Sequence, residues 1–155
     1  MSDIIEVLAK GGNLTEVNVS MLRSYMNRWG VDGYHALIET HVIPDFKIAD
    51  FLSEQLKIPR FYNLGVNDVS DAALEKLSYM KARKYCCLPI EITSDQCLKV
   101  IFADPTNEEA IKELENEIGM KITLAVSSKY EIEVAVGHIY SPQQQLNWIF
   151  EEGGS

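Results

Sequence analysis

Side chains that commonly bind metals or attack substrates are few in this chain, and they are widely separated. The three histidines, His35, His41 and His138, lack the short spacing of metal ligands. We interpret them as surface or hydrogen-bonded side chains. The cysteines are odd in number and two of them are adjacent, which argues against a disulfide framework and for a reducing compartment. The three are Cys86, Cys87 and Cys97. We interpret Cys86 and Cys87 as buried, inert thiols, with oxidation of an exposed member of the pair as the alternative.

No residue pattern in the sequence predicts a catalytic site. Asp104 precedes Pro105, a residue favoured in the first turn of a helix, so we interpret this aspartate as a helix cap and not as a catalytic acid. The pattern Gly-x-x-x-x-Gly-Lys-Ser/Thr, which cradles nucleotide phosphates, occurs nowhere in the 155 residues. The sequence thus predicts a chain that is not an enzyme, with no catalytic residue, metal or cofactor.

The charge of the chain limits its partners. Fourteen basic and 23 acidic residues give a net charge of −9, which disfavours binding to nucleic acid because phosphates require an excess of Lys and Arg. No apolar stretch approaches the roughly 18 residues of a membrane span, so we expect no direct membrane insertion. An acidic run predicts either a solvated helix face or a docking surface for a basic partner: Glu108, Glu109, Glu113, Glu115 and Glu117.

Two further groups of residues are candidates for binding a partner. The first is the local basic cluster, which either complements the dipole of a helix end or contacts a partner or lipid: Lys76, Lys81, Arg83 and Lys84. The second is an apolar group at 146–150 that includes Trp148 and Phe150. This group either packs back on the domain or binds a partner, for example a neighbouring ATPase domain.

The first 60 residues read as a helical lobe. Apolar residues at spacings of three and four, with glycines, Thr15 and Pro44 at the breaks, predict four helices: 3–10, 15–29, 34–40 and 44–56. Segments 7–15 and 36–44 share a weak repeat of helix, break, apolar pair and helix start. Ile58 to Phe61 should be extended, because the residue before Pro59 avoids helical geometry.

Residues 61–140 read as a mixed lobe. The pattern predicts a helix over 72–84, strands over 87–93 and 97–103, a helix over 105–118, a strand over 121–126, and a helix over 129–140 that begins with a Ser128/Glu131 capping box. The predicted fold class is therefore α+β: a helical lobe followed by a β-β-α-β-α sandwich with a small mixed sheet. We expect residues 141–155 to form a tail or a linker to a further domain.

Over roughly residues 35–140 the chain resembles the N-terminal domain of the bacterial type II secretion and type IV pilus assembly ATPases. Three segments, in the family's order and spacing, carry the resemblance: Ile43 to Pro59, with its Leu-Ser-Glu-Gln-Leu-Lys-Ile-Pro exit; Ala82 to Tyr85 with Leu88-Pro89; and Ala103-Asp104-Pro105, followed by an amphipathic helix and Gly119. The resemblance implies a non-catalytic regulatory domain that docks the motor onto the cytoplasmic part of an inner-membrane platform protein. It also implies a cytoplasmic location, peripheral to that membrane through the partner, and a possible downstream ATPase domain.

One branch of this family binds cyclic di-GMP through two helix-loop motifs that open with Arg-Leu-Gly and contain a later glycine. In this chain the equivalent residues of the first motif are Asp3, Ile4 and Ile5, with Gly12 kept. The second motif has Asp32, Gly33 and Tyr34, with His41 in place of the later glycine. Aspartate in place of arginine removes a phosphate donor and adds repulsion. We therefore expect no tight binding of cyclic di-GMP, and cyclic dinucleotide sensing is the disfavoured alternative function.

Overall fold

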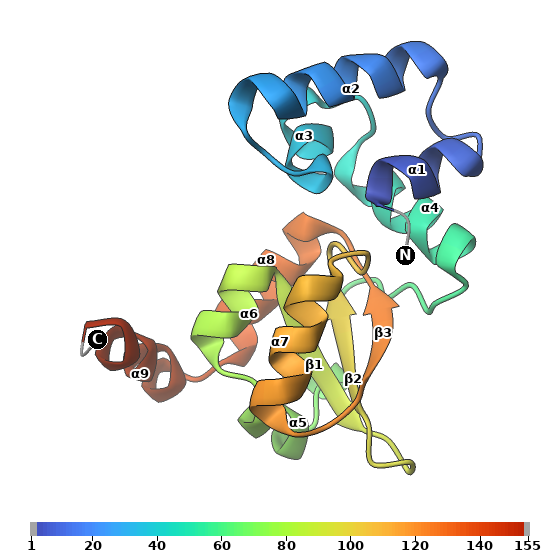
Figure 1. Ribbon diagram of the computed structural model, residues 1–155. Coiled ribbons are helices and arrows are strands. Elements are labelled where there is room, and N and C mark those ends of the chain that lie inside the picture. The colour runs from blue at the N-terminus through green and yellow to red at the C-terminus, as the bar shows by residue number, and fades with distance from the viewer. Residues whose placement is uncertain (1–2, 154–155) are drawn as a thin grey trace.

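The structure, a computed structural model, describes the backbone of residues 3–153 and the side chains of residues 3–147. Four helices come first, and a three-stranded sheet with further helices follows (Figure 1). The predicted α+β class is confirmed. Within the described range, no helix combines the length and the apolar character needed to cross a membrane.

The first four helices begin close to where the sequence predicts them. Asp3, Thr15 and Asp32 each cap a helix, because the side-chain oxygen accepts a hydrogen bond from the amide three residues on. The helices are α1 (Ile4–Lys10), α2 (Glu16–Trp29), α3 (Gly33–Thr40) and α4 (Asp45–Leu56).

The predicted repeat appears as two similar helix pairs. In each pair an aspartate caps the first helix, and a residue with positive φ follows it: Gly12 at 77° and His41 at 56°. The first helices of the two pairs, α1 and α3, lie close together, since a Cβ on Gly33 would lie 2.9 Å from Cγ2 of Ile4. Only glycine therefore allows α3 to start this near to α1.

The segment after α4 runs along the edge of the sheet. Val126 donates its amide to Pro59 O (2.9 Å), and Phe61 donates to Val126 O (3.0 Å), so Arg60 forms an isolated parallel bridge with Val126. The predicted extended conformation is thus confirmed. A short 3-10 helix, η1 (Val66–Asp68), follows.

The single helix predicted over 72–84 is wrong, because the chain forms α5 (Asp71–Lys76) and α6 (Tyr79–Tyr85). Leu77 between them is extended and buried. Ser78 caps α6 by accepting a hydrogen bond from the Lys81 amide. A serine that bonds to the backbone in this way competes with continuous helix. The hydroxyl of Tyr140 donates to the freed carbonyl of Leu77 (2.6 Å).

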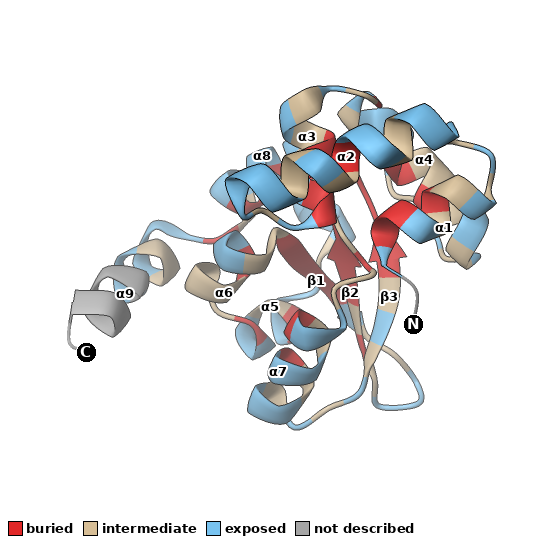
Figure 2. Ribbon diagram, turned by 45° about the horizontal axis from the view of Figure 1, so that its top comes forward, coloured by how far each residue is buried: buried red, intermediate tan, exposed pale blue. Residues whose placement is uncertain are grey.

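The sheet has the strand order β1-β2-β3. β1 (Cys87–Ile92) pairs antiparallel with β2 (Leu98–Phe102), and β2 pairs parallel with β3 (Ile122–Val126), which makes the sheet mixed, as predicted. Consecutive residues of β1 and β2 are buried, so both faces of the sheet are covered at its centre (Figure 2). The remaining helices are α7 (Glu108–Ile118), α8 (Lys129–Ile139) and α9 (Pro142–Gly153).

Asp104 does not cap α7, contrary to the sequence prediction. Asn107 caps this helix by accepting a hydrogen bond from the Ala110 amide, while Asp104 accepts from the amide and hydroxyl of Thr106. The Pro105-Thr106 pair forms a turn ahead of the helix, and the cap falls on the first side chain after that turn.

The two halves of the chain share one hydrophobic core. Buried side chains from the helices, such as Leu22 and Leu37, belong to the same cluster as Leu88 and Phe102 of the sheet. The lobe boundary near residue 60 stays a prediction. The predicted tail forms α9, whose Gln145 side chain donates to the carbonyls of Gly137 and Tyr140.

Candidate functional site

The predicted basic cluster divides in the structure. Lys81 lies against the acidic helix α7: its Nζ is 2.8 Å from Glu113 Oε1 and 3.7 Å from Glu117 Oε2. The hydrogen bond with Glu113 raises the pKa of Lys81 and lowers that of Glu113. Lys81 therefore cross-links α6 to α7, and part of the acidic run is used inside the domain.

The other three basic side chains of the cluster, Lys76, Arg83 and Lys84, are exposed, but they do not all line the same cavity. The guanidinium of Arg83 lies 5.7 Å from the ring centre of Tyr79, and the Nζ of Lys84 lies 5.1 Å from that of Tyr85. Both basic residues line one cavity at the end of α6. Lys76 borders a different cavity, together with Tyr140. The side chains of Trp148 and Phe150, the other predicted partner-binding residues, lie outside the described residues.

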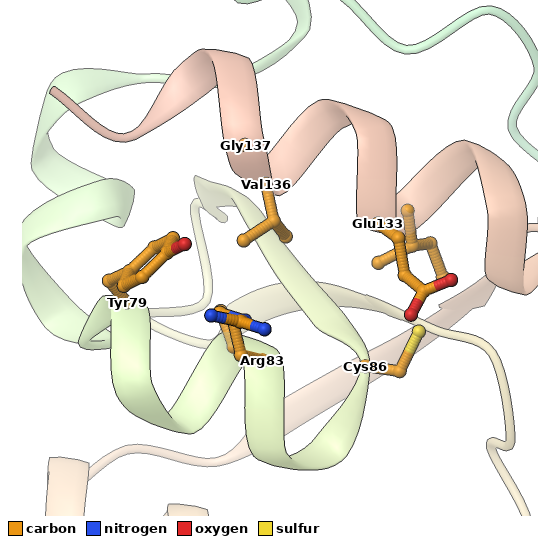
Figure 3. Close-up of a pocket in the computed structure, with 8 residues that line it drawn as sticks. Tyr79, Arg83, Cys86, Glu133, Val136 and Gly137 are labelled. Atoms are coloured by element: carbon orange, nitrogen blue, oxygen red, sulfur yellow. The ribbon is translucent and has the colours of Figure 1, made fainter. Parts of the chain in front are cut away.

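A groove of about 350 Å³ lies between α6 and α8 (Figure 3). Its two helices contribute opposite charges, Arg83 from α6 and Glu133 from α8, and the close-up shows both side chains directed into the space between the helices. Apolar side chains such as Ile132 and Val136 contribute to the lining, together with the ring of Tyr79. Such a groove can receive a mixed polar and apolar side chain from a partner.

Cys86 lines this groove, and its thiol is largely buried. Burial raises the pKa of the Cys86 thiol to about 12, and it raises the pKa of the adjacent, fully buried Cys87 thiol further. Since the thiolate is the nucleophile, neither residue should react readily below pH 10. This agrees with the prediction of inert thiols.

We expect a thiol-specific reagent such as DTNB to label the folded protein at Cys97 first, and Cys86 and Cys87 only after unfolding. The rates would be followed at 412 nm at pH 7.5, with and without urea. A Cys97→Ser variant is the control and should lose the fast phase. A fast phase that persists in this variant would show that Cys86 or Cys87 is accessible as a thiolate.

A second cavity, of about 150 Å³, lies where the start of α3 meets the end of α6 and the turn before α7. It brings together charges of both signs from separate segments, listed here in chain order: Asp32, His35, Arg83, Lys84, Asp104, Lys129 and Glu133. Burial raises the pKa of the Asp104 carboxyl. Across the described residues, no group of three or more His, Cys, Asp or Glu side chains is arranged to hold a metal ion.

The two aspartates at the motif openings are fixed at helix starts. Burial opposes ionisation of Asp3, but the hydrogen bonds from Arg23 (2.9 Å) and from the Glu6 amide lower its pKa overall. Asp32 accepts from the amide of His35 (2.9 Å) and contacts its ring Nδ1 (2.7 Å). Both openings therefore present a carboxylate that is already used in capping.

The sequence prediction missed one further candidate feature: large exposed apolar side chains on α8 and on two segments that contact it, α4 and η1. Its members come from three segments: Phe46 of α4, Val66 of η1, and Tyr130 and Val134 of α8. The spacing of four between Tyr130 and Val134 was a readable signal, because it places two large apolar side chains on one helix face. Their exposure was not readable, since α8 is apolar on its buried side as well.

The comparison with known protein families gives the class of this domain. Residues 56–146 match the MshEN domain model, so the chain belongs to the MshEN domain family, the N-terminal domain of type II secretion and type IV pilus ATPases. The resemblance found in the sequence is thereby confirmed.

Individual relatives agree with this assignment. The type IV pilus assembly ATPase PilB of Myxococcus xanthus (strain DK1622) is 30% identical over 106 residues, which cover 68% of this chain and 18% of PilB. The chain thus spans less than a fifth of the length of this relative.

Two solved structures share the fold. The structure of MshE with cdg covers 90% of this chain and 100% of its own, with a TM-score of 0.70 at 18% identity. A structure of the N-terminal domain of XpsE covers 89% of this chain and 94% of its own, with a TM-score of 0.71 at 21% identity.

Proposed function

We propose that this domain is a non-catalytic interaction module that docks a type II secretion or type IV pilus ATPase onto the cytoplasmic part of an inner-membrane platform protein. Membership of the MshEN family carries the proposal. The sequence supports it, since it contains no phosphate-binding loop. The domain would sit in the cytoplasm, peripheral to the inner membrane through its partner. ATP hydrolysis would belong to a separate or downstream domain.

Direct binding tests this proposal. The full chain, immobilised through a C-terminal tag, would be exposed to purified cytoplasmic domains of platform proteins from the same genome. We expect saturable binding to one of them, with a dissociation constant in the micromolar range or below. Failure of every such domain to bind at tens of micromolar would refute docking as the function.

Cyclic dinucleotide sensing is the second candidate, because the MshE structure that shares this fold was determined with cdg. The chemistry of the two motif openings argues against it in this chain. Asp3 and Asp32 place two carboxylates where the resemblance calls for guanidinium groups, and a bis-phosphate ligand would be repelled. Arg23 is the nearest basic substitute, but it is engaged with Asp3.

We expect isothermal titration with cyclic di-GMP to show no binding at ligand concentrations up to about 100 µM. The matched variant carries Asp3→Arg together with Asp32→Arg, which restores the arginine of each opening and should gain affinity. Circular dichroism would confirm that this variant stays folded after losing two helix caps. Micromolar binding by the unmodified chain would instead favour the sensing function.

A further inference from the structure

We propose that the apolar cluster of Phe46, Val66, Tyr130 and Val134, called here the α8 face, is the surface through which this domain docks. Its occupant would be a protein segment with an apolar centre surrounded by Lys and Arg side chains. The inference rests on the proposed docking function and assigns to it a surface and a partner chemistry.

The four side chains of the α8 face are large and exposed. The exposed fractions are 53% for Phe46, 67% for Val66, 71% for Tyr130 and 42% for Val134. Single exposed apolar residues are common, but large ones gathered from separate segments mark interaction sites.

Specific contacts hold these segments together. Asp45 Oδ2 accepts a hydrogen bond from the Tyr130 amide (2.8 Å), which brings the neighbouring Phe46 to the start of α8. Glu131 accepts from the Asn63 amide (2.8 Å), and η1 contacts α8, which places Val66 beside the same helix. Tyr130 and Val134 are one helical turn apart. Binding to a surface fixed in this way costs little ordering entropy.

A cavity adjoins the α8 face and can hold an anchoring side chain. Its volume is about 180 Å³, and Tyr130 forms part of its wall with Ile38 and Ile43. Asp45 and Glu133 contribute carboxylates to the lining, with Lys129 and His41 completing it. A pocket with apolar walls and acidic groups fits an apolar side chain that has a cationic neighbour.

The charges around the α8 face determine the sign of the partner. Six carboxylates belong to α4, η1 and α8: Asp45, Asp50, Glu54, Asp68, Glu131 and Glu133. Arg60 pairs with Asp50 and Glu131, Lys129 pairs with Glu133, and Lys47 is the other basic side chain of α4. These nine groups leave a net charge of −3. The chain as a whole carries −9. Electrostatic complementarity therefore favours a basic protein segment and disfavours an anionic membrane surface.

The test compares two matched double variants. Tyr130→Ser with Val134→Ser removes the centre of the α8 face, whereas Val17→Ser with Met21→Ser removes an equally exposed apolar pair on α2. We expect the first to weaken binding of the platform domain by at least about tenfold, and the second by less than about twofold. Raising the salt from about 50 to 300 mM should weaken binding by the unmodified chain. Equal binding by the two variants would overturn the proposal while leaving docking intact.

A partner-independent probe separates the two proposals. A synthetic amphipathic Leu/Lys helix of 18 residues should shift the amide resonances of residues 46, 66 and 130–134 of the ¹⁵N-labelled chain, and the matching Leu/Glu helix should not. Such shifts without platform binding would uphold the α8 face and reject the platform as partner. The proposal would be rejected if the Leu/Lys helix shifted other resonances or none. A separate assay would measure binding to 3:1 phosphatidylcholine/phosphatidylglycerol vesicles. The proposal would also be rejected if the unmodified chain bound these vesicles and the Tyr130/Val134 variant did not.

Discussion

Replacing Arg60 with alanine is expected to lower the free energy of unfolding by about 2–3 kcal/mol, because charged hydrogen bonds are lost while the half-buried carboxylates of Asp50 and Glu131 regain contact with water. The Arg60 side chain is only 7% exposed. Its Nε lies 3.0 Å from Asp50 Oδ1, and its Nη1 lies 3.3 Å from Glu131 Oε1. It also donates to Ser127 Oγ and to the carbonyl of Phe61. These partners come from α4, the end of β3 and α8, so one guanidinium joins the helical half of the chain to the sheet.

Urea denaturation followed by circular dichroism would measure the loss. Arg83→Ala is the matched control, since Arg83 is exposed at the end of α6, and it should change stability by less than about 0.5 kcal/mol. A change below about 1 kcal/mol for Arg60→Ala would mean that water replaces the lost donors and that the network contributes little.

A second set of variants separates charge from packing. Arg60→Met combined with Asp50→Asn and Glu131→Gln keeps the apolar stem and removes the carboxylates that would otherwise be left unpaired. We expect this triple variant to recover part of the stability lost in Arg60→Ala, because replacing a buried ion network by neutral groups is often close to neutral. A triple variant less stable than Arg60→Ala would contradict this reasoning.

Local sequence signals located most of the elements of this fold. Side-chain caps such as Thr15 and Ser128 identified helix starts, and Gly119 identified a helix end, because each of these depends on residues within one turn. The alternation after Cys87 likewise predicted β1. These features were readable since the physics that determines them is local.

The errors arose mostly where distant contacts decide the outcome. The break at Leu77 is stabilised by a hydrogen bond from Tyr140, 63 residues away, which no local pattern reveals. The error at Asp104 is of another kind, because it depended on the local geometry of the Pro105-Thr106 turn, which moves the cap to Asn107. The division of the basic cluster, like the break at Leu77, followed from a distant contact, the position of α7 against α6, which puts Glu113 beside Lys81. Helix propensity and charge counts do not contain this information.

Replacing Asp45 with alanine is expected to lower the free energy of unfolding by about 2–4 kcal/mol, because two hydrogen bonds to a charged acceptor are lost. Asp45 Oδ1 accepts from the Lys129 amide (2.9 Å) and Oδ2 from the Tyr130 amide (2.8 Å). These are the first two amides of α8, which have no partner within the helix, so a carboxylate from α4 satisfies them. The same urea titration would measure the loss. Asp45→Asn keeps one acceptor oxygen but loses the charge, and should cost about half as much.

The position of Asp45 also links stability to the α8 face, because its side chain ties the start of α4, which carries Phe46, to the Tyr130 amide. We therefore expect Asp45→Ala to weaken partner binding even where the variant is fully folded. Arg60→Ala should weaken binding less than Asp45→Ala when both variants are fully folded. Measuring both affinities at 10 °C, well below either unfolding transition, would separate the effects. If the folded Asp45→Ala variant binds the partner with unchanged affinity, Phe46 and Tyr130 contribute to binding independently. The α8 face would then not be a single docking surface.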